Sequence, residues 1–152
     1  MLEKVVIEVT QNELPLDLLL LSDPSEEVIN EYIDQCVTFS ATIDNKIVGA
    51  LLLLKTRPKT MEIMNVSVYE NYQNKGIGKK LIHKAIDYCR ETNCKTIEIG
   101  TGNPGVIQMM LYQKCGFRIV GVELDYFRKN HKEKIFENGI ECRDMIRMRM
   151  EL

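Results

Sequence analysis

The stretch VSVYENYQNKGIGKKLIHKAI, residues 66–86, constrains the fold of this chain more than any other. It begins as an alternating apolar strand, breaks at two closely spaced glycines, and continues with apolar residues at helical spacing on one face. Glycines at such a junction let backbone N–H groups converge without interference from Cβ atoms. Because a helix N-terminus adds partial positive charge, the junction favours an anion such as a phosphate or pyrophosphate.

Two familiar phosphate-binding patterns do not fit this junction. The Walker A pattern GxxxxGK[ST] fails because Gln73 stands where its first glycine belongs and Lys80 replaces the Ser or Thr. The dinucleotide pattern GxGxxG fails because Leu81 replaces its third glycine. The pattern that remains is Gln73-x-x-Gly76-x-Gly78, placed directly after a strand.

The rest of the chain alternates between strand and helix patterns. Alternation and β-branched residues predict strands at 3–10, 37–43, 46–56, 60–69, 95–101, 117–124 and 142–152, the second and third joined at Asp44-Asn45-Lys46. Helices are predicted at 14–22, 23–36, 76–92 and 106–115. The second helix has Asp23 as its N-cap and Pro24 at its first helical position, and Gly116 ends the last one. Residues 125–141 are polar and are expected to be an irregular, solvated loop that carries the basic residues Arg128, Lys129, Lys132 and Lys134. The order predicts a mixed α/β fold with a βαβ crossover through the 76–92 helix.

Composition narrows the possible functions. The 152 residues fit one domain, and a net charge of −2 gives no global attraction to nucleic acid. The charge is uneven, because residues 1–62 hold 5 Lys and Arg against 11 Asp and Glu, whereas residues 63–152 hold 15 against 11. An anionic ligand therefore suits the second part and a cationic ligand the first.

Cysteine and histidine usage argues against disulfides and metals. The five cysteines form no CxxC pair, and only two histidines are available as ligands, so reduced thiols and no metal site are expected. The N-terminal MLEKVVIEV has acids where a signal peptide needs an apolar run, and LPLDLLLLS is too short to span a membrane. These features predict a cytoplasmic protein without membrane or nucleic-acid partners.

Three segments together resemble one protein family. The Gln73-x-x-Gly76-x-Gly78 element, the preceding strand EIMNVSV and the later LYQKCGF resemble the GNAT superfamily of acetyl-CoA-dependent N-acetyltransferases. The resemblance spans nearly the whole chain, with residues 121–142 looking like an insertion before the last strand. It implies a GNAT-like α/β fold with a mostly antiparallel central sheet of about seven strands and about four helices. It also implies acetyl-CoA as cosubstrate and a splayed strand pair that holds it.

The resemblance also implies two catalytic residues. Glu62 lies eleven positions before Gln73, where several members carry the general base, although other members relay the proton through water. Tyr112 in LYQKCGF matches the tyrosine that protonates the departing thiolate. Cys115 has no histidine neighbour to activate it, so direct transfer in a ternary complex is expected, with Cys115 as core filler.

The implied cofactor contacts lie mostly along one segment. Backbone groups of the 66–68 strand would pair with the pantetheine arm, and one N–H would polarise the acetyl carbonyl. Many members have an Asn seven residues before the tyrosine, but here that position is Gly105, and Asn103 is expected to substitute as contact or helix cap. The full predicted set is Val66, Ser67, Val68, Gln73, Asn74, Lys75, Gly76, Ile77, Gly78, Lys79 and Asn103.

Acids on the first two helices indicate the acceptor. The acidic residues are Asp17, Glu26, Glu27, Glu31 and Asp34. They are expected to border the acceptor side of the site. Their negative charge would favour a small cationic amine, such as a polyamine, an aminoglycoside-like compound or an amino-acid derivative. A protein N-terminus or lysine remains an alternative acceptor. A non-catalytic acyl-CoA sensor and a P-loop or Rossmann nucleotide binder are rival functions. A homodimer paired through the last strand MIRMRMEL is a further expectation.

Overall fold

A computed structural model describes residues 4–152, so residue 3 of the first predicted strand and the start of the segment considered as a signal lie outside the described residues. The strands in this part are β1 Val6–Val9, β2 Val37–Ile43, β3 Lys46–Arg57, β4 Thr60–Val68, β5 Thr96–Gly102, β6 Arg118–Glu123, β7 Ile135–Glu137, β8 Ile140–Cys142 and β9 Met145–Glu151. The helices are α1 Leu16–Leu19, α2 Glu26–Tyr32, α3 Ile77–Glu91, α4 Val106–Lys114 and α5 Tyr126–Asn130, with short 3-10 turns at Ile33–Gln35 and Glu70–Tyr72.

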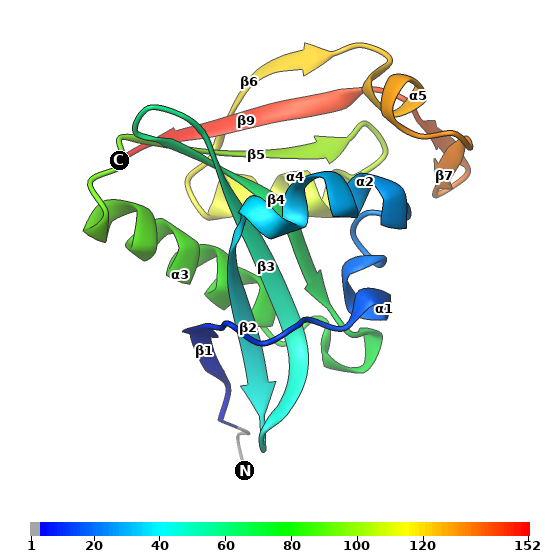
Figure 1. The fold of residues 1–152 in the computed structure, drawn as a ribbon. Helices are drawn as coiled ribbons and strands as arrows, with labels where there is room; N and C mark the ends of the chain where they lie inside the picture. Colours follow the sequence, from blue (N-terminus) through cyan, green and yellow to red (C-terminus); the bar gives the residue numbers. More distant parts are fainter. Residues whose placement is uncertain (1–3) are drawn as a thin grey trace.

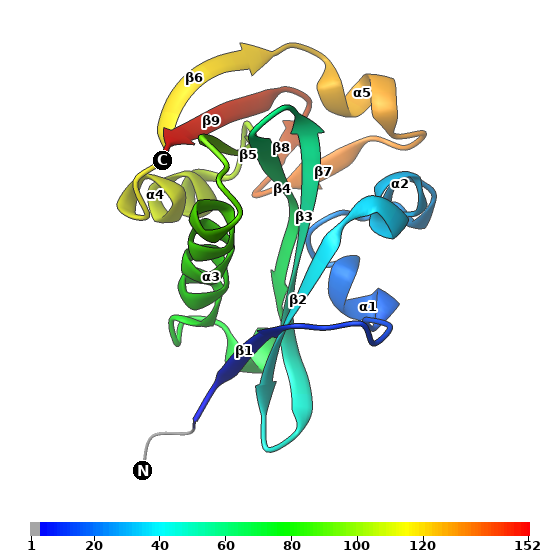
Figure 2. The same ribbon diagram turned by 60° about the vertical axis from the view of Figure 1, so that its left-hand side comes forward.

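Seven strands form one mixed sheet in the order β1-β2-β3-β4-β5-β9-β6 (Figure 1). All neighbours are antiparallel except β4 and β5, which α3 connects as a crossover. The sheet of about seven strands predicted from the family resemblance is therefore confirmed. A separate two-stranded hairpin, β7–β8, lies with α5 beside the end of β9 (Figures 1 and 2).

Helices cover both faces of the sheet. Figure 2 shows α3 and α4 on one side and α1 and α2 on the other. The apolar stripe of α3 packs on the first face, where Leu81, Ile82 and Ala85 are fully buried. On the opposite face, Leu18 and Leu19 of α1 pack against Ala50 and Leu52 of β3 in a second cluster. Both faces of β3 are therefore buried, which explains its long apolar run.

A β-bulge in β4 separates β4 from β5. Leu52 pairs with Asn65 and Leu53 with Ile63, so Met64 is an extra residue in the ladder. The parallel pairing of β4 with β5 ends at Ile63, the residue just before the bulge. Because a bulge bends and twists its strand, the remainder of β4 diverges from β5. This is the splayed strand pair that the family resemblance implied.

Several local predictions need correction. The β2–β3 turn contains two residues, Asp44 and Asn45, both at positive φ, as a type I′ turn requires. Ser25, not Asp23, is the N-cap of α2, because its hydroxyl accepts from the backbone N–H of Val28. The Asp23 carboxylate instead accepts from the backbone N–H of Ser25 and the hydroxyl of Tyr32.

The late segment is more ordered than its sequence indicates. Residues 125–141 contain α5 and the β7–β8 hairpin, so the prediction of an irregular loop is wrong, and α5 adds a short fifth helix within residues 4–152. Arg128 and Lys132, two residues of the predicted solvated basic cluster, form ion pairs with Glu141 and Glu27. The last strand, β9, is paired on both sides, with β5 and β6. It therefore has no free edge for pairing across a dimer, and the edge strand at this end of the sheet is β6.

Candidate active site

The edge of β4 that faces the splay carries backbone groups that are not paired with another strand. The N–H of Tyr69 donates to the carbonyl of Val48 on the β3 side, at 3.0 Å. Alternate residues of an antiparallel ladder bond to the same neighbour, so Val66 and Val68 direct their N–H and C=O groups to the opposite edge. Since β5 has diverged there, this edge is open to another extended chain.

Ser67 faces the other way. Its carbonyl oxygen would lie 3.1 Å from a Cβ built on Gly49 of β3, so the carbonyl points toward β3. Its hydroxyl donates to the Asn65 side chain at 2.7 Å, and Asn65 donates to the carbonyl of Leu19 at 3.0 Å. Of the three residues predicted to contact pantetheine through their backbone, Val66 and Val68 direct these groups to the open edge, whereas the Ser67 carbonyl points toward β3.

The glycine loop presents a run of free backbone donors. Among the described residues, nothing accepts a hydrogen bond from the backbone N–H groups of residues 74–79, and the first helical bond is from Lys80 to Gly76. Gly76 is the N-cap of α3 at a φ of +81°, a conformation that glycine adopts without strain. A Cβ at Gly76 would meet no atom within 4 Å, so it is the positive φ, and not crowding, that favours glycine there.

Neighbouring side chains hold this loop in place. The Gln73 amide donates to the Val68 carbonyl at 2.8 Å, so it ties the loop to the open edge of β4. The Lys75 ammonium lies 5.6 Å from the centre of the Tyr72 ring. Free donors, a helix N-terminus and nearby lysines suit a pyrophosphate, and the open strand edge suits an amide-containing arm. These features fit coenzyme A.

Glu62 lies on the opposite face of the sheet from α3. Its neighbours Met61 and Ile63 are in the α3 cluster, and side chains alternate along a strand, so Glu62 points the other way. Its carboxylate accepts from Arg147 at 3.1 Å, and 18% of the side chain is exposed. Burial raises the pKa of Glu62 above its ordinary value, the Arg147 charge opposes this shift, and the Glu98 charge adds to it. A carboxyl with a raised pKa is a better proton acceptor once it is ionised.

A pocket of about 320 Å³ opens beside Glu62. Its ionic lining consists of three arginines and three glutamates from five strands: Arg57, Arg147, Arg149, Glu62, Glu98 and Glu123. Arg57 and Arg149 both pair with Glu98, whereas Arg147 bridges Glu62 and Glu123. The acids predicted to wall the acceptor side do not line this pocket.

Tyr112 is buried on the α3 side of the sheet. It is 6% exposed and packs edge-on against Phe117, with ring centres 6.5 Å apart. Burial raises the pKa of its phenol, and the charges of Cys115 and Glu137 add to this shift. The phenol therefore stays protonated at neutral pH, as a proton donor must. Cys115 is also buried, and burial raises the pKa of its thiol.

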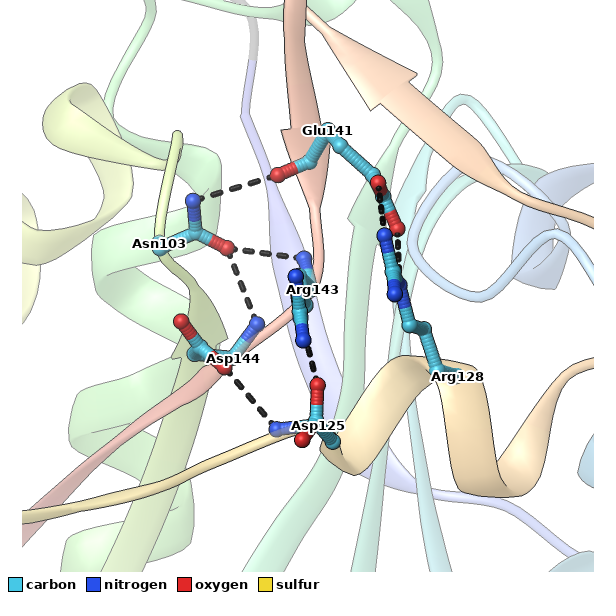
Figure 3. Close-up of polar contacts among 6 residues, drawn as sticks. All are labelled: Asn103, Asp125, Arg128, Glu141, Arg143 and Asp144. Atoms are coloured by element: carbon cyan, nitrogen blue, oxygen red, sulfur yellow. Dashed lines mark hydrogen bonds and ion pairs between the residues drawn. The ribbon is translucent and has the colours of Figure 1, made fainter.

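Asn103 joins β5 to the segment before β9. Its side-chain oxygen accepts from the backbone N–H groups of Arg143 and Asp144, and its amide donates to the carbonyl of Glu141 (Figure 3). The prediction that Asn103 caps α4 is wrong, because Gly105 is the N-cap and no side chain caps that helix. A Cβ at Gly105 would lie 2.3 Å from the Thr101 hydroxyl, so the asparagine that the family resemblance implies at this position would require the Thr101 side chain to move.

The late segment is anchored by side chains far apart in sequence. Asp125 pairs with Arg143, and Arg128 pairs with Glu141 through two hydrogen bonds (Figure 3). His131, with 6% of its side chain exposed, lies 3.0 Å from the Asp23 carboxylate near the start of α2. These contacts hold α5 near the face of the sheet that carries Glu62.

Sequence reasoning missed two residues beside Glu62. Arg147 projects from β9, and the ring of Tyr126 from α5 lies over its guanidinium, 5.2 Å from centre to carbon. Burial raises the pKa of Tyr126. The Arg147 charge opposes this shift, and the Glu62 charge adds to it. The alternation in MIRMRMEL indicated which residues share a face of β9. No local signal, however, showed that Arg147 would meet a strand 85 residues away.

Comparison with known proteins agrees with this geometry. The model of the acetyltransferase (GNAT) family matches residues 9–117. The Uncharacterized N-acetyltransferase YvbK of Bacillus subtilis is 48% identical over 145 residues, which cover 95% of this chain and 93% of that protein. A structure described as an IAA acetyltransferase from Bacillus cereus has a TM-score of 0.94 at 51% identity, covering 98% and 100% of the two chains. A GNAT family acetyltransferase from Elizabethkingia anophelis with acetyl-CoA bound has the same TM-score at 41% identity, covering 97% and 98%.

The chain belongs to the GNAT family of N-acetyltransferases. It is an acetyl-CoA-dependent enzyme with the family fold, and the cofactor is bound in a homologous structure. In residues 4–152, no helix is long and apolar enough to cross a membrane. The same residues contain no cluster of three or more His, Cys, Asp or Glu side chains suited to a metal ion.

Proposed function

We propose that this enzyme transfers the acetyl group directly to a primary amine of a small molecule, with Glu62 as general base and Tyr112 as general acid. The observation that carries this proposal is the position of Glu62, which is half-buried on β4 between the splay and a pocket of about 320 Å³. Pockets of about 300–1,000 Å³ are typical of small-molecule sites.

The acceptor amine must lose a proton before or during attack. A primary amine with a pKa near that of Lys, about 10.4, is protonated at neutral pH. Glu62 is ionised when Arg147 pairs with it, and its raised pKa makes it a suitable acceptor for this proton. Arg147 thus favours the charged form of the carboxylate, which lines the pocket.

The other half of the reaction needs a proton donor on the α3 side. Acetyl-CoA supplies the activated acetyl group when it is bound. The residues that we propose to hold it are the backbone of Val66 and Val68 and the loop from Gln73 to Lys79. Tyr112 lies on the same side of the sheet as that loop, and its raised pKa keeps the phenolic proton available for the leaving thiolate.

We propose a small cationic amine as the acceptor. The exposed acids of α1 and α2 give that end of the molecule negative charge, although Lys132 pairs with Glu27 and the hydroxyl of Tyr69 donates to Asp17. The equal numbers of arginines and glutamates around the pocket make its own lining neutral. Selection for a cation would therefore come from the helices and not from the pocket lining.

Residues 1–152 would act as one catalytic domain in this proposal. A reducing compartment such as the cytoplasm suits the five cysteines, all of which are free thiols.

The test measures acetylated products by mass spectrometry over a panel of amines. The panel includes a polyamine, an aminoglycoside, an amino-acid amide, a neutral amine and peptides with a free N-terminus or a lysine. We expect the highest kcat/KM on a small cationic amine. Higher activity on a peptide would assign the enzyme to protein acetylation, and preference for a neutral amine would contradict the charge argument. Binding of acetyl-CoA without product from any amine would favour a sensor.

A further inference from the structure

β6 is the edge strand at one end of the sheet, opposite the β1 end, and pairs only with β9 (Figures 1 and 2). Four large apolar side chains in or next to it are about half exposed or more: Ile119 51%, Val120 49%, Val122 54% and Leu124 66%. An edge strand with free backbone groups and exposed apolar side chains is a template for pairing with another strand.

A bulge in β6 determines which of its side chains share a face. Ile119 pairs with Met148 and Gly121 with Arg147, so Val120 is an extra residue. Residues opposite each other in a sheet share a face, and alternate residues along a strand also share one.

The result is a strand with one ionic and one apolar face. Arg118 pairs with Arg149, and Glu123 forms an ion pair with Arg147, so both lie on the face that carries Glu62. Ile119 and Val122 are opposite Met148 and Ile146, which pack in the α3 cluster, so these two lie on the other face. Without the extra residue, Arg118 and Glu123 would lie on opposite faces, since they are five positions apart.

This pattern is complementary to itself. If a second β6 runs antiparallel with Val120 opposite Gly121, Arg118 meets Glu123 of the partner, and Ile119 meets Val122. In each of these two pairs the side chains lie on the same face, as a continuous sheet requires. Arg118 forms no ion pair with any described residue, and the Glu123 side chain is 47% exposed despite its contact with Arg147. Opposite charges directly across two strands stabilise their pairing.

We propose that β6 pairs antiparallel with β6 of a second copy of this chain, about a twofold axis between Val120 and Gly121. The two seven-stranded sheets then form one continuous sheet, and each Arg118 meets the partner's Glu123. Val120 and Glu123 also line the pocket beside Glu62. The dimer would therefore border the proposed acceptor pocket of each copy.

The test is the mass of the full chain in solution, measured by light scattering after size exclusion over a range of concentrations. We expect the wild type at twice the 17.6 kDa of one chain. Arg118→Glu and Glu123→Arg should each weaken the dimer about tenfold or more, because each change puts two like-charge pairs at the interface. The matched controls, Arg90→Glu and Glu91→Arg on the exposed end of α3, should leave the dimer unchanged.

Mixing the two charge variants gives the decisive measurement. A chain with Glu at positions 118 and 123 is complementary to a chain with Arg at both, so the mixture should form a heterodimer although each variant alone does not. The double variant Arg118→Glu/Glu123→Arg should recover a homodimer. A monomeric wild type would overturn the proposal and would mean that the bulge protects the edge. Single variants that remain fully dimeric would overturn it in favour of another interface.

Discussion

The two sides of the proposed site are built from different groups. On the α3 side, the groups that can bind coenzyme A are backbone N–H and C=O groups from the open edge of β4 and backbone N–H groups from residues 74–79. On the opposite side, the pocket is lined by arginine and glutamate side chains that pair with one another. Backbone groups are positioned by the fold whatever the side chains are, whereas a lining of side chains changes with each substitution. The cofactor side can therefore remain constant while the acceptor side varies.

The largest expected loss of activity distinguishes Glu62 from Glu98, the glutamate opposite it in the charged lining of the pocket. Glu62→Gln should lower kcat/KM by about 10²- to 10⁴-fold, because it removes the proton acceptor. Glu98→Gln is the matched control, since Glu98 lies opposite Glu62 on β5 but pairs with Arg57 and Arg149. Steady-state kinetics with the preferred amine measure both. Equal losses in the two variants would mean that the charge network, and not a base, sets the rate.

A smaller loss is expected from the α3 side. Tyr112→Phe should lower kcat by about 10²-fold, the lower end of the range for an acid or base, without weakening acetyl-CoA binding, because the phenolic proton is lost and the ring remains. Tyr88→Phe is the control, since Tyr88 packs edge-on against Phe39, away from the loop and the pocket. Titration calorimetry with acetyl-CoA accompanies the rate measurement. A Tyr112→Phe enzyme as fast as wild type would exclude Tyr112 as the acid.

Asn103 tests the anchoring of the late segment. Asn103→Ala should lower the free energy of unfolding by about 2 kcal/mol, because it leaves two backbone N–H groups and one carbonyl without their partner. The matched variant Asn130→Ala loses one exposed hydrogen bond, to the Tyr126 carbonyl, and should cost about 0.5 kcal/mol or less. Chemical denaturation measures both. A weaker affinity for acetyl-CoA in Asn103→Ala, with unchanged stability, would support the predicted cofactor contact instead of a structural role.

The smallest effect is a shift in pH dependence. Arg147 lowers the pKa of Glu62, so Arg147→Gln should raise it and move the acidic limb of kcat/KM to higher pH. Arg147→Lys should keep most of the wild-type profile, because it retains the positive charge. Arg149→Gln serves as control, since Arg149 pairs with Glu98. A limb that stays in place in Arg147→Gln would indicate that another group is the base.

The sequence predicted the elements whose signals are local. The glycine loop, α3 and the β2–β3 hairpin follow from turn residues and apolar periodicity within a few positions of each other. The order of the elements and the family resemblance together predicted the seven-stranded sheet.

Elements that depend on distant contacts were not predictable. The five-residue helix α5 has no side-chain cap, and it is held by the contacts of Arg128 with Glu141 and of His131 with Asp23. Asp and Ser are equally good N-cap residues, so the sequence does not distinguish Asp23 from Ser25. The Asp23 carboxylate instead contacts His131, 108 positions later in the chain. The Glu62–Arg147 pair depends likewise on β9 lying two strands from β4. Pattern and propensity carry no information about such pairings.

The strand order has a consequence for how the molecule assembles. β6 precedes β9 in the chain but touches no other strand of the sheet, because β9 lies between it and β5. During synthesis, β6 therefore leaves the ribosome before the strand that it needs, and its apolar residues stay without a sheet until residues 145–151 follow. A chain cut short between residues 124 and 145 would lack β9, and its unpaired apolar β6 segment would be a target for chaperones.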